Sequence, residues 1–284
     1  MSHTESKSNE TFFEETPLSP DALNSISKTL FIPLYGKAFV SRQGLLLDDP
    51  KAEEIWASFE FPLKGKSKSK WLAYYMAMRS RVFDDWTRDM LAVNPDALVL
   101  HLGCGLDDRH GRAGEGCSMW IDADLPEVIT ERRRFFSETD SYRMMGFNAV
   151  YPRSLEALPP AETAIVAMEA LAMYLTPEEL NDLLSALEAK YDHVHILMDP
   201  YTDFGARVSK LGNPVKDVGV TQVNGFEDIS MVISYTGLHL ERELDSTPPK
   251  LVVELPTLDR LIFKAIFAGS FAKRIYRLHE LSNA

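Results

Sequence analysis

The stretch Leu98–Val128, LVLHLGCGLDDRHGRAGEGCSMWIDADLPEV, decides the fold class. An apolar run over 97–102 stops at a glycine–cysteine–glycine turn, and a second short apolar run, 119–121, ends in two acids, Asp122 and Asp124. The order strand, glycine turn, helix, strand, acid is that of a nucleoside-binding half of a doubly wound sheet. Glycine allows a ligand to approach the backbone because it carries no Cβ, and an acid after the second strand can accept both hydroxyls of a ribose.

The charges in this turn indicate which nucleoside binds. The dinucleotide fingerprint has a third glycine where this chain has Asp108, and it places a pyrophosphate at the helix start. Asp107 and Asp108 occupy that start, and two like charges ~4 Å apart repel by ~4 kcal/mol at a surface-like dielectric. S-adenosylmethionine carries a sulfonium, an ammonium and a ribose but no phosphate, so it suits these acids better. Asp107 can equally well be interpreted as a helix cap.

Two motifs resemble the leucine carboxyl methyltransferase family, which includes protein phosphatase methyltransferases and bacterial polyketide O-methyltransferases. HLGCGLDDR (101–109) is similar to the family's GxGLDTR, and WIDADLPEVI (120–129) is similar to its acidic-x-Asp-Leu-Pro-x-Val motif. The other segments that resemble the family are MRSRVFDD (78–85), AMEALAMYLTPEEL (167–180), TLFIPLYGKAFVSR (29–42) and DDPKAEEI (48–55). The resemblance extends from about residue 27 to the fifth predicted strand, and the two motifs at this spacing make it specific.

The resemblance implies an S-adenosylmethionine-dependent O-methyltransferase. The fold it implies is α/β: a doubly wound, mostly parallel, seven-stranded Rossmann-like sheet with an N-terminal helical cap. The cofactor-binding residues that it implies by position are Arg79, Gly103, Cys104, Gly105, Asp107, Asp124, Leu125, Asn148 and Glu169.

The same resemblance assigns roles to some of these residues. Arg79 would bind the methionine carboxylate, with Arg81 as the alternative, and Glu169 would face the amino-acid end. Asp124 would hold the ribose. Asn148 stands where some members have an acid that contacts adenine, and its amide oxygen can still accept a hydrogen bond. Ala170, where many members have glycine, would narrow the pocket.

The resemblance implies that the methyl acceptor is an oxygen, carboxylate or hydroxyl, of a small molecule or of a protein. Tyr174 is the candidate residue on the acceptor side, with packing on the cofactor or a helix as the alternative. An ionised carboxylate acceptor needs no general base, whereas a phenol with pKa ~10 benefits from one. Histidines 101, 110, 193 and 195 are the candidate bases, and the sequence assigns none of them. A non-catalytic cofactor-binding member and an NAD-dependent Rossmann oxidoreductase are the alternative functions.

Composition limits the function classes further. The net charge of -12 argues against nucleic acid, which binds to basic surfaces. The polar N-terminus lacks the apolar core of a signal peptide, no apolar run approaches membrane-spanning length, and a cytoplasmic location without a membrane partner is expected. Two cysteines, 104 and 117, indicate neither a disulfide framework nor a metal site. The oligomeric state cannot be read from the sequence.

The chain is expected to divide into a flexible N-terminus (1–20), a helical cap (21–92) and the cofactor-binding core (93–284). Alternating elements predict a parallel sheet with right-handed crossovers. The predicted strands are 97–102, 118–123, 142–147, 164–168 and 194–199, with an extended segment at 239–244. A helix over 258–275 and a last strand over 276–281 complete the pattern. Thr176-Pro177-Glu178-Glu179 predicts a helix start with a capping box.

Overall fold

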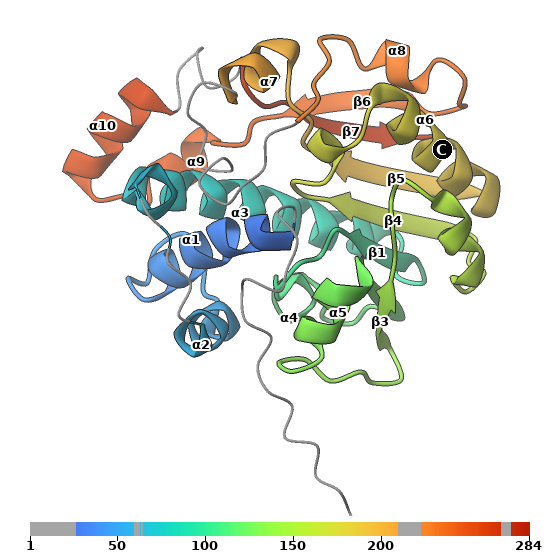
Figure 1. The fold of residues 1–284 in the computed structure, drawn as a ribbon, viewed down its shortest axis with the longest axis horizontal. Coiled ribbons are helices and arrows are strands. Elements are labelled where there is room, and N and C mark those ends of the chain that lie inside the picture. Colours follow the sequence, from blue (N-terminus) through green and yellow to red (C-terminus); the bar gives the residue numbers. More distant parts are fainter. Residues whose placement is uncertain (1–26, 60–62, 64, 210–222, 268–273) are drawn as a thin grey trace, which may run out of the picture.

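The computed structural model describes residues 27–59, 63, 65–209, 223–267 and 274–284, so the predicted flexible N-terminus lies outside the described residues. Its strands are β1 (Leu98–Leu102), β2 (Met119–Asp124), β3 (Tyr142–Gly146), β4 (Thr163–Met168), β5 (His193–Met198), β6 (His239–Leu244) and β7 (Leu278–Ser282). They form one seven-stranded sheet in the order β3-β2-β1-β4-β5-β7-β6 (Figure 1). Strands β1 to β5 run parallel, and β7 pairs antiparallel with β5 and β6. The predicted fold class is confirmed.

Helices connect and cover these strands. The helices are α1 (Phe31–Ser41), α2 (Pro50–Ser58), α3 (Lys70–Val93), α4 (Arg109–Ala113), α5 (Pro126–Arg132), α6 (Pro177–Lys190), α7 (Asp203–Ser209), α8 (Ser230–Ile233), α9 (Pro249–Val252) and α10 (Thr257–Ile266). Short 3-10 turns lie at Ser27–Leu30, Gly65–Lys68, Pro152–Ala157 and Ala172–Tyr174. The predicted capping box is confirmed, since Thr176 and Glu179 bond reciprocally at the start of α6. None of the described helices is long and apolar enough to cross a membrane.

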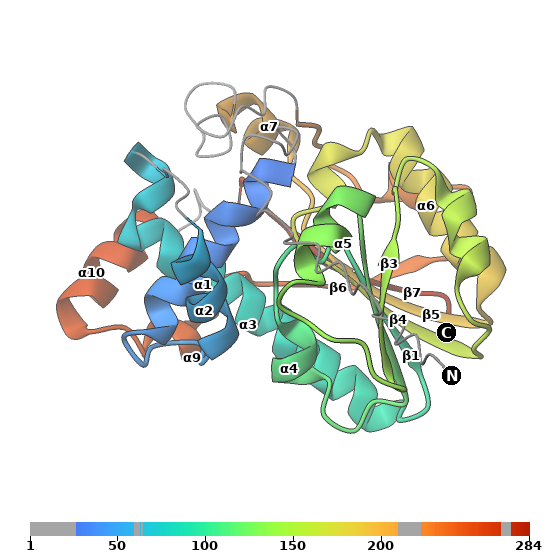
Figure 2. The ribbon, with the colours of Figure 1, turned by 60° about the horizontal axis from the view of Figure 1, so that its bottom comes forward.

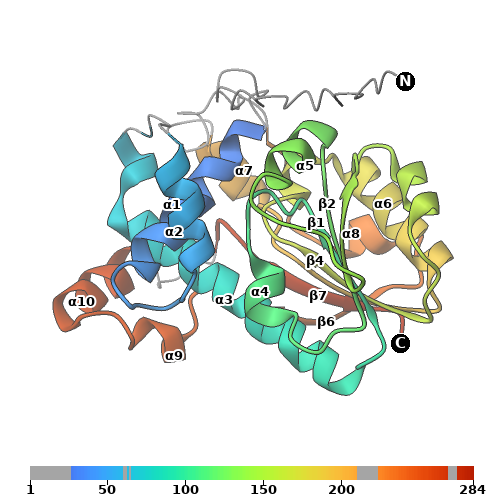
Figure 3. The same ribbon diagram turned by 90° about the horizontal axis from the view of Figure 1, so that it is seen from below.

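The sheet separates two hydrophobic layers. Alternate residues of β1 face opposite sides, because successive side chains of a strand do so: Val99 packs in the layer with α3, and Leu98 and Leu100 pack in the layer with α6. Figures 2 and 3 show α6 and α8 on one face, α3 and α4 on the other, and α1 and α2 beyond α3. The cap therefore meets the sheet through α3.

The strand order places a ligand site between β1 and β4. The chain moves outward from β1 to β2 and β3 on one side, and continues with β4 and β5 on the other. At such a switch point the loops after adjacent strands diverge, which leaves a crevice at their carboxyl ends. The glycine turn follows β1, Asp124 ends β2, and Glu169 follows β4, so all three lie at this crevice.

The C-terminal part of the chain adds to the cap. Asp259 of α10 accepts hydrogen bonds from Lys70 Nζ at 2.9 Å and from Tyr74 OH at 2.8 Å, both on α3. Helices α9 and α10 lie on the same side of the molecule as α1 and α2 in Figures 1 and 2, although they follow the sheet strands in the chain. The boundary between cap and core at residue 92 stays a prediction.

The predicted helix over 258–275 is wrong at residues 267, 274 and 275, and its part over 268–273 lies outside the described residues. Helix α10 ends at Ile266. The carbonyl of Ile275 accepts from the Thr202 amide at 3.0 Å, and Tyr276 forms a β-bridge with Tyr201. Backbone groups committed to the segment after β5 cannot also form helical hydrogen bonds.

One buried carboxylate joins the first three strands. Asp122 Oδ1 accepts from Trp120 Nε1 at 2.8 Å and from His101 Nδ1 at 3.0 Å, and Oδ2 accepts from Tyr142 OH at 2.6 Å and from Arg132. Against the effect of burial, Arg132 and His101 hold the pKa of Asp122 well below its ordinary value of 3.8. Asp122 therefore has a structural role, and Asp124 is left to serve the site.

We expect Asp122→Asn to lower the free energy of unfolding by about 3 kcal/mol at neutral pH, because it leaves Arg132 buried without its counter-charge. A carboxyl whose pKa is depressed by folding stabilises above its unfolded value and loses that effect as pH falls. The difference between wild type and variant should therefore shrink below pH 3.8. Urea unfolding at several pH values measures it, with exposed Asp96→Asn as the control. Equal stabilities of the Asp122 variant and wild type at neutral pH would contradict the assignment.

Candidate cofactor and acceptor site

A cavity of about 330 Å³ lies at the carboxyl ends of the strands. Its size is within the range of small-molecule sites. It is lined from four directions: by α1, by α3, by the turns after β1, β2 and β4, and by the segments around α7 and Tyr276. One part of the wall is charged, and the other is apolar and aromatic.

The glycine turn brings backbone to the cavity surface. Gly103 and Gly105 have φ of 71° and 54°, a region that favours glycine. A Cβ on Gly103 would lie 3.2 Å from Leu171 Cβ. The turn is thus fixed both by its backbone conformation and by the close approach of the segment after β4.

Asp124 faces the cavity with its carboxylate held in place. Its Oδ2 accepts from the Gly105 amide at 2.7 Å, and its Oδ1 accepts from the Leu125 amide at 2.7 Å. Each carboxylate oxygen has a further lone pair for a ligand hydroxyl. Burial raises the pKa of Asp124 to about 6, although these two backbone hydrogen bonds oppose the shift. Hydroxyl donors from a ligand would lower that pKa, so a ribose fits this position.

Asp107 is surrounded by cations, which corrects the charge argument made from the sequence. Its carboxylate lies 2.6 Å from Lys37 Nζ, 2.9 Å from Arg112 Nη2 and 3.0 Å from Arg109 Nη2. Against the effect of burial, Arg112, Lys37 and Arg109 hold the pKa of Asp107 well below its ordinary value. The charge of Asp107 is therefore compensated inside the protein and does not by itself select a cationic ligand.

The helix cap falls on Asp108 instead of Asp107. The Asp108 carboxylate accepts from the Gly111 amide at 3.1 Å at the start of α4. An anion-binding helix start needs free amides, and here the carboxylate uses one of them. This geometry disfavours a diphosphate at the turn and with it the dinucleotide alternative.

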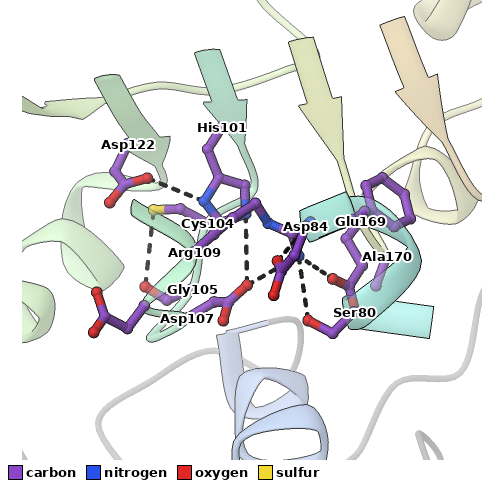
Figure 4. Close-up of polar contacts among 12 residues, drawn as sticks. Ser80, Asp84, His101, Cys104, Gly105, Asp107, Arg109, Asp122, Glu169 and Ala170 are labelled. Atoms are coloured by element: carbon purple, nitrogen blue, oxygen red, sulfur yellow. Dashed lines mark hydrogen bonds and ion pairs between the residues drawn. The ribbon is translucent and has the colours of Figure 1, made fainter. Parts of the chain in front are cut away.

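Glu169 and Arg79 form the centre of the charged wall. Arg79 Nε donates to Glu169 Oε1 at 3.1 Å, and Arg79 Nη1 lies 2.9 Å from Asp199 Oδ2. Glu169 also contacts Arg109 Nη2 (Figure 4). Burial by itself would raise the pKa of Glu169, but the charges of Arg79 and Arg109 outweigh it and lower that pKa to about 2. Burial raises the pKa of Asp199 to about 7, opposed by Arg79.

The two arginines proposed for the methionine carboxylate differ in position. Arg79 is 1% exposed and lines the cavity. Arg81 is partly exposed, donates to the Leu46 carbonyl at 2.7 Å and does not line the cavity. The geometry favours Arg79, whose role stays a prediction.

The sequence reasoning assigned no role to Lys37, Arg109 or Arg112. All three carry charge in segments that the structure buries: Lys37 lies on an apolar helix, and Arg109 stands inside the quoted GLDDR motif. A lone lysine in the apolar run FIPLYGKAFV was the available signal, since a buried charge requires a partner.

The second part of the cavity wall is aromatic. Tyr75, Tyr201, Tyr276 and Phe267 line it, and the Tyr201 and Tyr276 rings lie 4.4 Å apart. Tyr276 OH donates to Tyr201 OH at 2.6 Å. Tyr174, the predicted acceptor-side residue, also lines the cavity, and burial raises its pKa well above the ordinary value. Its hydroxyl is therefore protonated at neutral pH.

Of the four candidate histidines, His101 lines the cavity, and its Nδ1 is committed to Asp122. His110 stacks on Tyr142 with ring centroids 4.5 Å apart. His193 and His195 lie in the first half of β5, away from its carboxyl end. Burial lowers the pKa of His101, so its ring is neutral at pH 7.

The remaining predicted residues divide into two groups. Cys104 and Leu125 line the cavity, and Cys104 is a free thiol. Asn148 does not line it: its Oδ1 accepts from the Val150 amide at 3.1 Å, within its own turn. An adenine contact by Asn148 stays a prediction that this geometry does not support. The described residues contain no cluster that could hold a metal ion.

Comparison with known proteins identifies the family. The leucine carboxyl methyltransferase profile matches residues 21–188. The chain belongs to the leucine carboxyl methyltransferase family. It is 30% identical over 201 residues to the tetracenomycin polyketide synthesis O-methyltransferase TcmP of Streptomyces glaucescens, covering 70% of this chain and 74% of that protein.

Two further comparisons agree. A Gibberella zeae S-adenosyl-L-methionine-dependent methyltransferase, dpfgK, is 30% identical over 181 residues, which are 57% of this chain and 60% of that protein. The magnesium protoporphyrin IX methyltransferase of Synechocystis, crystallised with S-adenosylhomocysteine, has a similar fold: the TM-score is 0.51 at 12% identity, over 83% of this chain and 93% of that one. The protein is an S-adenosylmethionine-dependent methyltransferase, and the glycine turn, Asp124 and the charged wall fit that cofactor.

Removing the Asp124 carboxylate should weaken cofactor binding. We expect Asp124→Ala to cost ~1–3 kcal/mol of binding free energy, because the ribose hydroxyls lose their acceptor. Isothermal titration with S-adenosylhomocysteine measures this loss, with exposed Asp96→Ala as the matched control. Unchanged affinity in the Asp124 variant would show that another group holds the ribose.

Ala170 stands in a backbone conformation that favours glycine. Its φ is 59°, and its amide donates to Asp199 Oδ1 at 2.6 Å. A left-handed conformation costs a non-glycine residue roughly 1–2 kcal/mol, partly offset in Ala170→Gly by the greater entropy of the unfolded chain. We expect this variant to gain about 0.5–1 kcal/mol of stability in urea unfolding. A loss of stability would show that the site does not strain alanine.

Proposed function

We propose that the protein methylates a hydroxyl or carboxylate oxygen of a small, largely apolar aromatic molecule. The observation that carries this proposal is the aromatic wall formed by Tyr75, Tyr201, Tyr276 and Phe267, which is continuous with the charged wall in a single cavity. Aromatic side chains recognise flat apolar ligands through offset or edge contacts. The similarity to TcmP, named for polyketide synthesis, supports a small-molecule acceptor.

The alternative acceptor is a protein C-terminal carboxylate. Such a group would need a cation on the acceptor side of the cavity. The lysine and the arginine that line the cavity are already paired with protein carboxylates: Lys37 with Asp107, and Arg79 with Glu169 and Asp199. The charge balance therefore favours an acceptor without a permanent negative charge deep in the site, which argues for a hydroxyl over a carboxylate.

Methyl transfer requires alignment of the acceptor oxygen, the methyl carbon and the leaving sulfur, and S-adenosylmethionine supplies the methyl group. The protein residues contribute positioning and exclusion of water. Asp124 and the glycine turn fix the nucleoside end, the pairs of Glu169 fix the wall beside it, and the aromatic side chains hold the acceptor in a dry environment. Tyr201 and Tyr276 place two hydroxyl groups among these rings, which can orient an acceptor oxygen.

The test compares acceptors with methyl-labelled S-adenosylmethionine. Small aromatic molecules bearing a phenol or a carboxylic acid are assayed beside a peptide that ends in a free leucine carboxylate. We expect labelled product from the small aromatics, and the label tells ether from ester because alkali releases methanol from an ester only. Product from the peptide alone would overturn the proposal. Binding of S-adenosylhomocysteine without turnover of any acceptor would favour the non-catalytic alternative.

A further inference from the structure

Helix α10 presents an apolar face to solvent on the side opposite its buried one. Phe263 is fully buried, whereas Leu258, Leu261, Ile262 and Ile266 are 69, 63, 37 and 50% exposed. Their spacing of three and four residues places them on one side of the helix. We call these four side chains the α10 stripe. None of the four belongs to a hydrophobic cluster formed by the described residues.

The stripe differs from ordinary surface hydrophobics by its continuity. Single exposed apolar residues need no explanation, but contiguous patches mark interaction surfaces. The other large exposed hydrophobics of the described surface stand singly or in pairs: Val93, Leu240, Val253, the neighbours Val150 and Tyr151, and Met231 with Tyr235. In the α10 stripe, four large aliphatic side chains share one helix of ten residues.

The charge beside the stripe is opposite to that of the whole protein. The chain carries a net charge of -12, yet residues 63–72 hold four lysines and no acid. The contact of Lys70 with Asp259 brings the start of α3 against α10 and neutralises that acid. On α10 itself Lys264 is exposed, and Lys68 is exposed beside Lys70. Near the stripe, Lys68 and Lys264 are the exposed lysines that make no ion pair among the described residues.

We propose that the α10 stripe, with Lys68 and Lys264, docks the protein on an anionic lipid surface. A helix that combines an aliphatic face with flanking lysines lies in the interface of a bilayer, where burial of the apolar face and attraction to anionic headgroups add. Composition predicts no membrane partner because it averages the charge over the whole chain. The structure shows that the charge is unevenly distributed.

Two other occupants fit these observations less well. In a two-fold contact between copies, the flanking lysines of one copy would be brought close to those of the other, and like charges repel. An acidic protein partner would satisfy the lysines. The stripe, however, contains only aliphatic side chains and no polar group that could give a protein contact its specificity.

Vesicle flotation tests the proposal with the full-length protein. We expect flotation with vesicles of phosphatidylcholine and phosphatidylglycerol, and loss of flotation with pure phosphatidylcholine or at high salt, which screens the lysines. Leu261→Asp should reduce binding about tenfold or more, since an apolar side chain is lost from the interface and a charge is added. Met231→Asp makes the same kind of change on α8, where Met231 is 74% exposed, and should leave binding unchanged.

The remaining outcomes overturn the proposal. They are absence of flotation, equal flotation of Leu261→Asp and wild type, and a concentration-dependent dimer that Leu261→Asp abolishes while vesicles stay unbound. The last result would show that the stripe binds a second copy of the chain. Light scattering after gel filtration detects such a dimer. Titration with S-adenosylhomocysteine shows that each variant is folded, because the stripe lies outside the cofactor cavity.

Discussion

The buried contacts of Glu169 with Arg79 and Arg109 organise this molecule. Arg79 comes from α3, Arg109 from the start of α4 and Glu169 from the turn after β4, so one carboxylate joins the cap to two loops of the sheet. Removing one partner would leave a charge buried without compensation, at a cost of several kcal/mol. The pairs therefore have to form together, and this fixes how the cap closes over the carboxyl ends of the strands.

The requirement that each buried charge has a partner extends along the charged wall of the cavity. Arg109 also holds Asp107, which in turn holds Lys37 on α1. The cavity is thus enclosed by elements far apart in the sequence, and its charged side is nearly balanced before any ligand enters. The Asp124 carboxylate, oriented by two backbone amides, offers a directional contact that does not depend on net charge.

The two walls divide the chemistry. The groups of the charged wall are mutually paired, and the other wall is formed by four aromatic side chains. A methyl transfer that needs alignment more than proton transfer suits this division. The cap contributes to both walls, through Lys37 and Arg79 on one side and Tyr75 on the other. Helix α10 packs on the outside of the same cap and exposes the stripe, whose side chains pack in none of the hydrophobic clusters of the described residues.

The sequence by itself determined the fold class, six of the seven strands to within one residue at each end, and the turn residues that line the cavity. These features are local: a glycine turn after an apolar run and a capping box specify their structure within a few residues. Only the tertiary structure decided which charges meet. The sequence shows Asp107 and Asp108 as adjacent acids, but folding surrounds one with cations from α1 and α4 and uses the other as a cap. It likewise ended α10 at Ile266 and paired the backbone of Ile275, which the sequence predicts as helical, with the segment following β5. Interactions between segments far apart in the sequence depend on how the layers of helices and strands pack. A local sequence pattern does not specify which distant side chains will come into contact.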